Sequence, residues 1–425
     1  MRHDGVPCAL PRQSNESGII PQHIVARSPA TYALLLFVAL SSGLCPEANA
    51  AQRDRSNKPL PAPLLPAEAA WAVVLPSPAS AAGALDAERV YIPLQTGQLV
   101  ALNRETGVTE WSLELASSWA PMIRDGVLYT TTTREVMALR AATGDPLWRV
   151  SLDADLMGAP ALQGDSVVVL LKPDQLRSVR LSDGSEVWRR TIPAPSASAA
   201  MAVDTSGVVV ASGNRVSRFA STDGQLEWER ELGGDLSSPT VSGDRVFVGS
   251  TDNYLYSLDT NTGRIVWRYG TGGDVVGATA DDRFVYVAAL DNLLRALRRG
   301  SGNQVWKRDL STRTIAPPST FGNVVVVSGN NPALAAFNAT TGDPIDKFEL
   351  AADVQGIPLV DALVPFRVAM IVITRDGRAI GLRSIRMMFR EPPLAPLQAL
   401  PGRPLNREPF SLPTAQSPAP NSQSR

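Results

Sequence analysis

Thr262–Trp267 reads Thr-Gly-Arg-Ile-Val-Trp, and a glycine followed four residues later by a tryptophan recurs along the chain. The pairs are Gly107/Trp111, Gly144/Trp148, Gly184/Trp188, Gly224/Trp228, Gly263/Trp267 and Gly302/Trp306, with successive glycines 37 to 40 residues apart. A seventh copy keeps Gly342 but has Asp346 where the tryptophan is expected. A repeat of about 40 residues with one large aromatic per unit is typical of a β-propeller built from four-stranded blades.

One repeat unit shows how the strands are predicted. Alternating β-branched and aromatic residues indicate strands, and the pairs Asp252-Asn253 and Thr262-Gly263 suit tight turns. Pro239 fits the start of an innermost strand better than its middle. The four strands are expected at Ser237–Val241, Arg245–Ser250, Tyr254–Asp259 and Arg264–Tyr269.

Two incomplete units lie at the ends of the repeat region. Trp71–Leu75 (WAVVL) has the pattern of a fourth strand, 40 residues before Trp111, but no inner strands precede it. Val368–Thr374 and Arg378–Arg383 have the pattern of inner strands, but no tryptophan strand follows them. We therefore expect an all-β fold, an eight-bladed propeller of four-stranded antiparallel blades, in which the N-terminal strand completes the C-terminal blade and removes an open sheet edge.

Seven of the eight tryptophans occupy the same position in the repeat: Trp71, Trp111, Trp148, Trp188, Trp228, Trp267 and Trp306, with Trp119 as the exception. Tryptophans can form stacking platforms for a cofactor. A residue that recurs once in every unit does not mark a single site, however. The spacing therefore predicts that these side chains, with the repeat glycines from Gly107 to Gly342, pack between blades.

The N-terminus has the features of an export signal. The apolar run Tyr32–Leu44 follows Arg27 and is too short to span a bilayer. Ala48-Asn49-Ala50 then provides a cleavage site of small residues, so residues 1–50 are predicted to be a signal peptide with a long leader, cleaved after Ala50. Whether Met1 is the true start stays open. Lipidation of Cys45 is the alternative, but Ser42-Gly43-Leu44 is a poor context for it.

Cysteine and histidine are confined to the leader, at His3, Cys8, His23 and Cys45. A chain cleaved after Ala50 contains neither residue. Such a chain has no disulfide, no thiolate or imidazole nucleophile, and no zinc or copper site built from His and Cys. Any catalysis would have to use carboxylates, hydroxyls, lysine or a bound cofactor.

Charge and composition divide the rest of the chain. The net charge of −1 gives no overall field for nucleic acid or an anionic membrane surface. Residues 51–66 are rich in proline and are predicted to be a linker, and the propeller is predicted over residues 67–388. Residues 389–425 contain nine prolines with Ser, Gln and Asn, and predict a disordered tail.

Units such as Leu258–Trp267 (LDTNTGRIVW) and Ala138–Trp148 (ALRAATGDPLW) resemble the pyrroloquinoline-quinone-type propeller repeat. The resemblance covers Ala70 to about Ser384. It implies the propeller fold, which carries both enzymes and scaffolds. One branch of this family, the quinone-dependent alcohol dehydrogenases, uses a vicinal disulfide, a Ca²⁺ held by Glu, Asn and Asp, and an Asp base. The predicted mature chain has no cysteine, and no match to those calcium and base motifs is found.

In length and layout the chain is more similar to the BamB family, the propeller subunits of the outer-membrane β-barrel assembly machinery. This resemblance implies a scaffold without a redox centre, whose loops from one blade's last strand to the next blade's first contact a protein partner. BamB proteins normally carry a lipid. The segment Ile192–Ala197 lacks the Leu and Arg side chains of the corresponding BamB loop, so no binding residue is carried over.

These observations give a first hypothesis and two alternatives. The first is a non-catalytic scaffold without cofactor or metal, located in the periplasm or peripheral to the outer membrane. It is expected to act as a monomer within a protein complex, and its mature chain is expected to have no transmembrane span. Its partner contacts are expected on the loops between blades. The candidate residues are Pro193, Pro195, Gly234, Asp235, Leu236 and Asp274.

The alternatives are an enzyme that uses a quinone or a carboxylate pair at the propeller axis, and a periplasmic binder of a small ligand or glycan. The residues that face the central channel discriminate between these hypotheses. Convergent Asp, Asn and Arg with an aromatic residue favour an enzyme or ligand site, and short apolar walls favour the scaffold.

Overall fold

The computed structural model describes residues 67–192, 199–311, 313–314, 316–329, 332–350, 352–355, 358–360 and 367–384. Contacts divide the chain into Met1–Lys58 and Pro59–Arg425, and all described residues belong to the second unit. The predicted signal peptide with Ala48 and Ala50, the linker, residues 385–388 and the tail lie outside the described residues. In the part of the chain that the structure describes, there is no helix with the length and apolarity that a membrane crossing requires.

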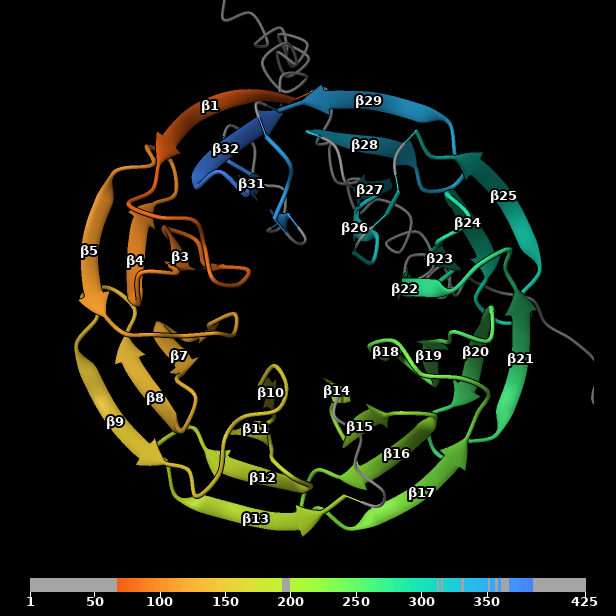
Figure 1. The fold of residues 1–425 in the computed structure, drawn as a ribbon, viewed down its shortest axis with the longest axis horizontal. Helices are drawn as coiled ribbons and strands as arrows, with labels where there is room; N and C mark the ends of the chain where they lie inside the picture. The colour runs from red at the N-terminus through yellow and green to blue at the C-terminus, as the bar shows by residue number, and fades with distance from the viewer. Residues whose placement is uncertain are drawn as a thin grey trace, which may run out of the picture. The chain divides into compact units, whose positions relative to one another are not determined.

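The described residues form eight four-stranded antiparallel sheets arranged as a ring (Figure 1). We number the blades along the chain. Blade 1 contains β2 (Ala84–Leu85), β3 (Arg89–Pro93), β4 (Gln98–Asn103) and β5 (Thr109–Glu114). Blade 2 contains β6 (Met122–Arg124), β7 (Val127–Thr131), β8 (Glu135–Arg140) and β9 (Pro146–Ser151). Blade 3 contains β10 (Ala161–Gln163), β11 (Ser166–Leu171), β12 (Gln175–Arg180) and β13 (Glu186–Thr191). Blade 4 contains β14 (Ala199–Val203), β15 (Gly207–Ser212), β16 (Arg215–Ala220) and β17 (Leu226–Glu231).

The second half of the ring follows the same order from the innermost to the outermost strand. Blade 5 contains β18 (Thr240–Ser242), β19 (Arg245–Gly249), β20 (Tyr254–Asp259) and β21 (Ile265–Gly270). Blade 6 contains β22 (Val275–Ala280), β23 (Phe284–Ala289), β24 (Leu293–Arg298) and β25 (Gln304–Asp309). Blade 7 contains β26 (Ser319–Phe321), β27 (Val324–Ser328), β28 (Ala333–Asn338) and β29 (Pro344–Glu349). The closure blade contains β30 (Leu359–Val360), β31 (Met370–Ile373), β32 (Arg378–Ser384) and β1 (Ala67–Val74).

The predicted closure of the ring is confirmed. β1 pairs antiparallel with β32, with Trp71 opposite Gly381 and Val74 opposite Arg378. Within blade 5, β20 has the predicted bounds, whereas the innermost strand is Thr240–Ser242 rather than Ser237–Val241. This difference has a simple reason. Pro239 has no N–H to donate to a ladder, so regular pairing begins after it, and Leu236 upstream forms only an isolated bridge with Ser250.

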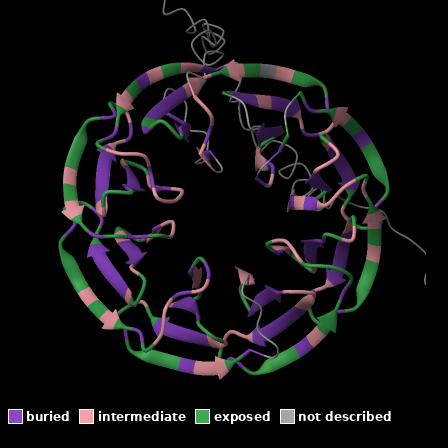
Figure 2. Ribbon diagram, viewed as in Figure 1, coloured by how far each residue is buried: buried purple, intermediate pink, exposed green. Residues whose placement is uncertain are grey.

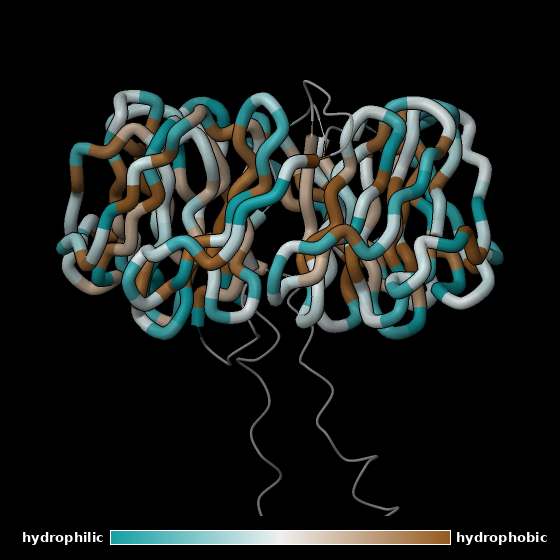
Figure 3. Tube along the Cα trace, turned by 90° about the horizontal axis from the view of Figure 1, so that it is seen from below, coloured by the Kyte–Doolittle hydropathy of each residue, from teal (hydrophilic) through white to brown (hydrophobic). Residues whose placement is uncertain are grey.

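Burial follows the position of a strand within its blade (Figure 2). The two middle strands are flanked by the neighbouring blades on both faces, so they are continuously apolar and buried, as Val167–Leu171 shows with no exposed surface. Eight separate hydrophobic clusters fill the eight joints between blades. Seen edge-on, hydrophilic residues gather at the loops along the two faces of the ring, with hydrophobic strands between them (Figure 3).

A bulge turns each tryptophan toward the next blade. In blade 3, Ser178 pairs with Trp188 but Val179 pairs with Glu186, so Val187 has no partner in the ladder. The other blades have the same irregularity at the same place. Because an inserted residue bends and twists the strand, the indole leaves its own sheet and reaches the neighbouring one. The skipped residue lies on the outer wall, which explains exposed aliphatic side chains such as Val187 and Val305.

Each of these indoles occupies the same kind of pocket. The Nε1–H donates to the carbonyl oxygen three residues before the repeat glycine of the following blade, at 2.8–3.1 Å. The glycine lies directly against the ring. Gly263, for example, has φ +64°, and a Cβ there would lie 2.5 Å from Trp228 Cε3. Each tryptophan contacts the glycine of the next unit, in the pairs Trp71/Gly107, Trp111/Gly144, Trp148/Gly184, Trp188/Gly224, Trp228/Gly263, Trp267/Gly302 and Trp306/Gly342.

Blade 7 has Asp346 where the other blades have a tryptophan, and the blade that follows it lacks the corresponding turn. Asp346 lies opposite Ala336 in the ladder, the register position of the other tryptophans. The next sheet is the closure blade, whose third strand β32 ends the repeat region and whose fourth strand β1 begins it. No turn joins these two strands, so the described residues of the closure blade include no repeat glycine against which an indole could lie.

Candidate functional site

One face of the ring carries the loops that join successive blades, together with the hairpins between the second and third strands of each blade. The second and fourth strands of an antiparallel blade run in the same direction, so both kinds of connection lie at the same end. We call this face the interblade rim. Of the loop residues that the sequence singled out as partner contacts, those that the structure describes lie on this face: Gly234, Asp235, Leu236 and Asp274.

Backbone hydrogen bonds hold the loops of the rim in place. The loop after β17 is fixed at its start by Leu232 N, which donates to Asn214 O at 2.8 Å, and further on by Asp235 O, which accepts from Thr251 N at 2.9 Å. The first bond goes to the hairpin of blade 4 and the second to the hairpin of blade 5. Equivalent second bonds join Gln95 N to Pro78 O, Lys172 N to Asp155 O, Leu290 N to Asp274 O and Arg375 N to Asp353 O. The described loops of the rim are therefore held by the hairpins of the blades that they join.

Two neighbouring loops of the rim share the sequence Gly-Gly-Asp, at Gly233–Asp235 and Gly272–Asp274. The glycines allow close approach of the hairpin of the following blade. A Cβ at Gly233 would lie 2.2 Å from Asp252 Oδ2, and one at Gly272 would lie 2.9 Å from Asp291 Oδ2. The Gly272 N–H in turn donates to Asp291 Oδ2 at 2.8 Å. The motif thus sets the packing of loop against hairpin in blades 5 and 6.

The hairpin carboxylates at these two places have partners within the protein. Asp291 forms an ion pair with the buried Arg295. Burial alone would raise the pKa of Asp291, but the hydrogen bond and positive charge of Arg295 outweigh it, and the pKa lies below its ordinary value. Asp252 accepts a hydrogen bond from the hydroxyl of Tyr256, whose pKa is raised by burial and by this bond.

The loop carboxylates are different. Asp235 is exposed and Asp274 is half-buried. Among the described residues, neither carboxylate accepts a hydrogen bond or forms an ion pair, although the backbone of each residue is fixed by the bonds given above. Two carboxylates without a described partner therefore lie on loops whose backbone is fixed.

The remaining predicted contact residues have structural contacts. Gly234 has φ +61°, and a Cβ there would lie 2.7 Å from Thr251 Oγ1. Leu236 bridges to Ser250 and packs on the cluster between blades 4 and 5. Pro193 and Pro195 lie outside the described residues. The sequence prediction thus brought Asp235 and Asp274 onto one face. It missed the partners Tyr256 and Arg295, which the spacing of four residues from Asp252 and Asp291 could have indicated.

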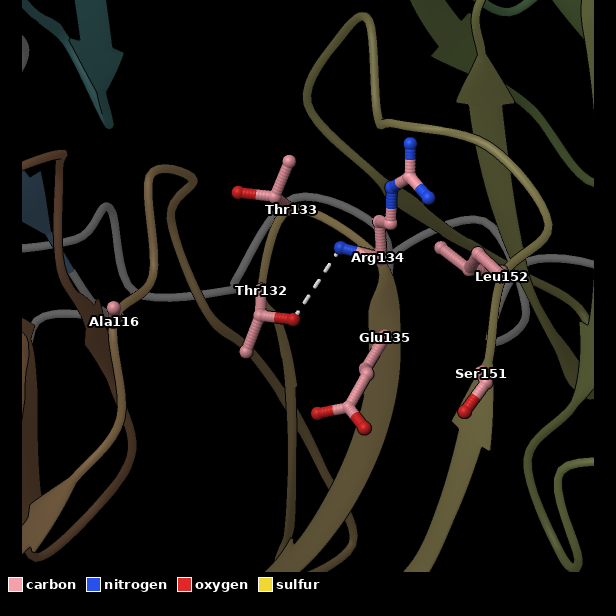
Figure 4. Close-up of a pocket in the computed structure, with 7 residues that line it drawn as sticks. All are labelled: Ala116, Thr132, Thr133, Arg134, Glu135, Ser151 and Leu152. Carbon is pink, nitrogen blue, oxygen red and sulfur yellow. Dashed lines mark hydrogen bonds between the residues drawn. The ribbon is translucent and has the colours of Figure 1, made fainter.

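A hollow of about 520 Å³ opens on the rim at blade 2 (Figure 4). Its lining residues are Ala116, Thr132, Thr133, Arg134, Glu135, Ser151 and Leu152. Arg134 stands at its edge, and its Nε donates to Asp155 Oδ1 at 2.5 Å. Its lining combines hydroxyls, one carboxylate and one guanidinium with the apolar side chains of Ala116 and Leu152. Such a hollow offers both polar and apolar contacts to a partner's side chain.

A second hollow, of about 510 Å³, lies on the opposite face between blades 4 and 5. Its carboxylates are already paired. Asp204 contacts Arg218, which is 1% exposed, and Asp244 contacts Arg299. Burial would raise the pKa of Asp204, but the bonds from Arg218 lower it below its ordinary value. These charges stabilise the blades and are not available to a ligand.

The central channel is lined by the innermost strands, whose composition tests the alternatives stated above. Within the described residues of β2, β6, β10, β14, β18, β22, β26 and β30, Arg124 is the single charged residue. Its guanidinium donates to the carbonyl oxygen of Gly164 in the next blade. Phe321 is the single aromatic residue of these strands, and it packs into the joint between blade 7 and the closure blade. The described residues also contain no group of three or more acidic, His or Cys side chains that could hold a metal ion.

Comparisons with known proteins agree with this architecture. The sequence profile of a family described as "Outer membrane protein assembly factor BamB" matches residues 67–216, 212–316 and 291–384. No curated protein matches the chain in sequence.

Solved structures share the fold at low sequence identity. BamB from Moraxella catarrhalis has a TM-score of 0.59 at 18% identity, over 75% of this chain and 99% of that one. The quinohemoprotein alcohol dehydrogenase ADHIIG from Pseudomonas putida HK5 has a TM-score of 0.60 at 12% identity, over 81% and 79%. Sqt1 from Saccharomyces cerevisiae has a TM-score of 0.62 at 10% identity, over 73% and 96%.

Proposed function

Because the chain belongs to the family described as "Outer membrane protein assembly factor BamB", we propose that it is a non-catalytic scaffold of the bacterial cell envelope that docks a protein partner through its interblade rim. The observation that carries the proposal is the contrast between rim and channel. The rim presents the unpaired carboxylates of Asp235 and Asp274 on loops fixed by backbone bonds. The described inner strands offer one charged side chain, already bonded.

A fixed rim favours docking in physical terms. Binding loses affinity when loops and side chains must be ordered at the interface, and loops held from both sides avoid part of that cost. Two outward carboxylates on neighbouring loops fit a partner segment with lysine or arginine side chains, since charge-assisted hydrogen bonds are stronger than neutral ones. Outer-membrane protein assembly is the specific process that we propose for this docking.

The rim proposal is tested with a double variant, Asp235→Asn with Asp274→Asn. Partners are cross-linked in intact envelopes, captured with the protein and identified by mass spectrometry. We expect the main partner of the wild type to be reduced about tenfold or more, because two charge-assisted bonds are lost. The matched control is Asp165→Asn with Asp282→Asn, which removes the same charge from exposed turns between first and second strands on the opposite face. Equal loss in both variants, or no loss in either, would contradict docking at the rim.

Export is a second element of the proposal. Tyr32–Leu44 followed by Ala48-Asn49-Ala50 supports cleavage after Ala50 and a periplasmic protein, free or peripheral to the outer membrane. Intact-mass analysis of protein purified from envelopes is expected to give a chain that begins at Ala51. A mature chain that begins at a diacylated Cys45 would show instead that the protein is a lipoprotein.

The alternative function is that of a quinone-dependent dehydrogenase, and the fold shared with the Pseudomonas putida enzyme makes it worth testing. The residues of this chain do not fit it: the described inner strands supply neither the carboxylates for a calcium ion nor a free aromatic platform. We expect no alcohol-dependent dye reduction after incubation with pyrroloquinoline quinone and Ca²⁺, and no quinone binding by calorimetry. Turnover in this assay would overturn the scaffold proposal.

A further inference from the structure

We propose that the ring has a seam: the joint between blade 7 and the closure blade opens more readily than the other seven joints. The proposal begins with what those seven joints share. At each, an indole donates a hydrogen bond to a backbone carbonyl of the next blade and lies against the glycine of the same turn. Parting such a joint breaks this bond and withdraws a large aromatic ring from its place.

The joint between blade 7 and the closure blade is built differently. Its position for the tryptophan holds Asp346, and the closure blade has no turn that could receive an indole. The contacts that the structure describes across it are apolar, between Val326, Leu334 and Ala336 on one side and Met370, Val372 and Ile380 on the other. Apolar clusters occur at all eight joints. What distinguishes this joint is that it lacks the indole hydrogen bond of the other seven. Apolar contact is non-directional and imposes no fixed geometry on the two sheets.

The opposite side of the closure blade is tied firmly to blade 1. Trp71 Nε1 donates to Arg104 O at 2.8 Å, and the fully buried Arg104 returns a bond from its Nε to Val368 O at 2.7 Å. The Val368 N–H donates to Glu105 Oε2 at 3.1 Å. At the rim, Gln355 Nε2 donates to Ala79 O at 2.6 Å. The closure blade is therefore expected to move together with blade 1 when the seam parts.

The seam also lies next to the points where the chain enters and leaves the ring. Ala67 pairs with Ser384, so the first and last described residues are neighbours on the closure blade. Tension on either flanking segment acts directly on this blade. Tension on these segments can thus open the ring at the seam without unfolding a sheet. The joint lies between two sheets, so the ladders inside each blade stay intact when it parts.

Adjacent residues of one strand provide the test. Val326 faces the seam, and its neighbour Val325 faces the joint between blades 6 and 7; they are 2% and 0% exposed. Single cysteines are introduced as Val326→Cys and Val325→Cys, in the full chain with Cys8 and Cys45 replaced by serine. Labelling by N-ethylmaleimide is followed under native conditions. We expect Cys at position 326 to react about tenfold faster, the ratio expected for one hydrogen bond's difference in the opening equilibrium.

A second pair keeps the test decisive if a valine variant fails to fold. On the closure blade, Met370 faces the seam and Ile371 faces the joint with blade 1, each 1% exposed. Met370→Cys is expected to label faster than Ile371→Cys by a similar ratio. Unfolding of a strand or of the whole domain exposes both members of a pair together. Equal rates within each pair, or faster labelling at the positions that face away from the seam, would overturn the proposal.

Discussion

The two neighbours of blade 7 are held in different ways. Toward blade 6, Trp306 donates to Ala339 O at 3.1 Å and its ring lies against Gly342, while the buried Tyr286 donates to the same carbonyl at 3.2 Å. Toward the closure blade, Asp346 replaces the tryptophan and the described contacts are apolar. The difference teaches that the repeat tryptophan occurs where the following blade has a turn with the repeat glycine. The irregular seventh copy stands next to the blade that is closed by a strand from the other end of the chain.

The largest loss of stability is expected from deleting β1, the strand that closes the ring. Deleting Lys58–Ser77 removes β1, leaves β32 as an open edge and takes Trp71 out of its joint. Loss of one buried tryptophan costs about 3–5 kcal/mol, and a domain has only about 5–15 kcal/mol in total. We therefore expect no cooperative thermal transition by near-UV circular dichroism.

The control for this deletion is removal of Ala51–Asn57, which lies upstream of β1 and outside the described residues. This variant is expected to melt like the parent chain. An unchanged melting temperature in the variant that lacks Lys58–Ser77 would show that β1 does not hold the ring closed.

A truncated tryptophan tests the directed joint itself. Trp306→Ala leaves a cavity between blades 6 and 7 and removes one of the two hydrogen bonds that the Ala339 carbonyl accepts. The free energy of unfolding, measured by guanidinium titration, is expected to fall by about 3–5 kcal/mol. Trp119→Ala is the matched control, since Trp119 lies outside the repeat position and is half-buried. If the free energy of unfolding falls no more in Trp306→Ala than in Trp119→Ala, the indole joint contributes no more to stability than a tryptophan outside the repeat.

The glycine on the other side of the same joint is expected to have a smaller effect. Gly342 has φ +73°, and a Cβ there would lie 2.6 Å from Trp306 Cδ2. Gly342→Ala combines an unfavourable backbone conformation with displacement of the indole, so we expect a loss of about 1–3 kcal/mol. Gly300→Ala is the control because no atom lies within 4 Å of its Cβ position. The control is expected to change stability by less than about 0.5 kcal/mol. Similar losses in the two variants would contradict the proposed contact.

The fold could be predicted from the sequence because its signals are local and repeated. The spacing of Gly263 and Trp267, the turn at Asp252-Asn253 and the unpaired pattern at Trp71 are each visible within one unit, and β20 was predicted at its observed bounds. What could not be predicted is which repeat glycine contacts which tryptophan. The sequence motif suggests that Gly107 belongs with Trp111, whereas the structure places Gly107 against Trp71. That pairing depends on the bulge and on the order of blades in space.

The candidate site was predictable only in part for the same reason. Loop position brought Asp235 and Asp274 into consideration, and both lie on the interblade rim. The sequence could not show that Asp252 and Asp291 have Tyr256 and Arg295 as partners, while the loop carboxylates have none among the described residues. Those contacts join a hairpin to a strand side chain whose direction is set by packing between blades. The chemical identity of a partner is not encoded in such contacts, so it stays a proposal.

The smallest effect on stability is expected at position 346, where the repeat lacks its tryptophan. Asp346→Trp restores the repeat at the one position that lacks its tryptophan, so a consensus argument predicts that it stabilises the ring as the other tryptophans do. The structure gives the opposite expectation. The closure blade offers no turn between β32 and β1, and hence no repeat glycine to lie against an indole. We expect the free energy of unfolding to change by less than about 0.5 kcal/mol, as for an ordinary surface substitution. Asp346→Ala serves as the control for loss of the carboxylate. A gain of several kcal/mol in the tryptophan variant alone would show that the joint can accept an indole after all, and that the missing turn is not the reason for Asp346.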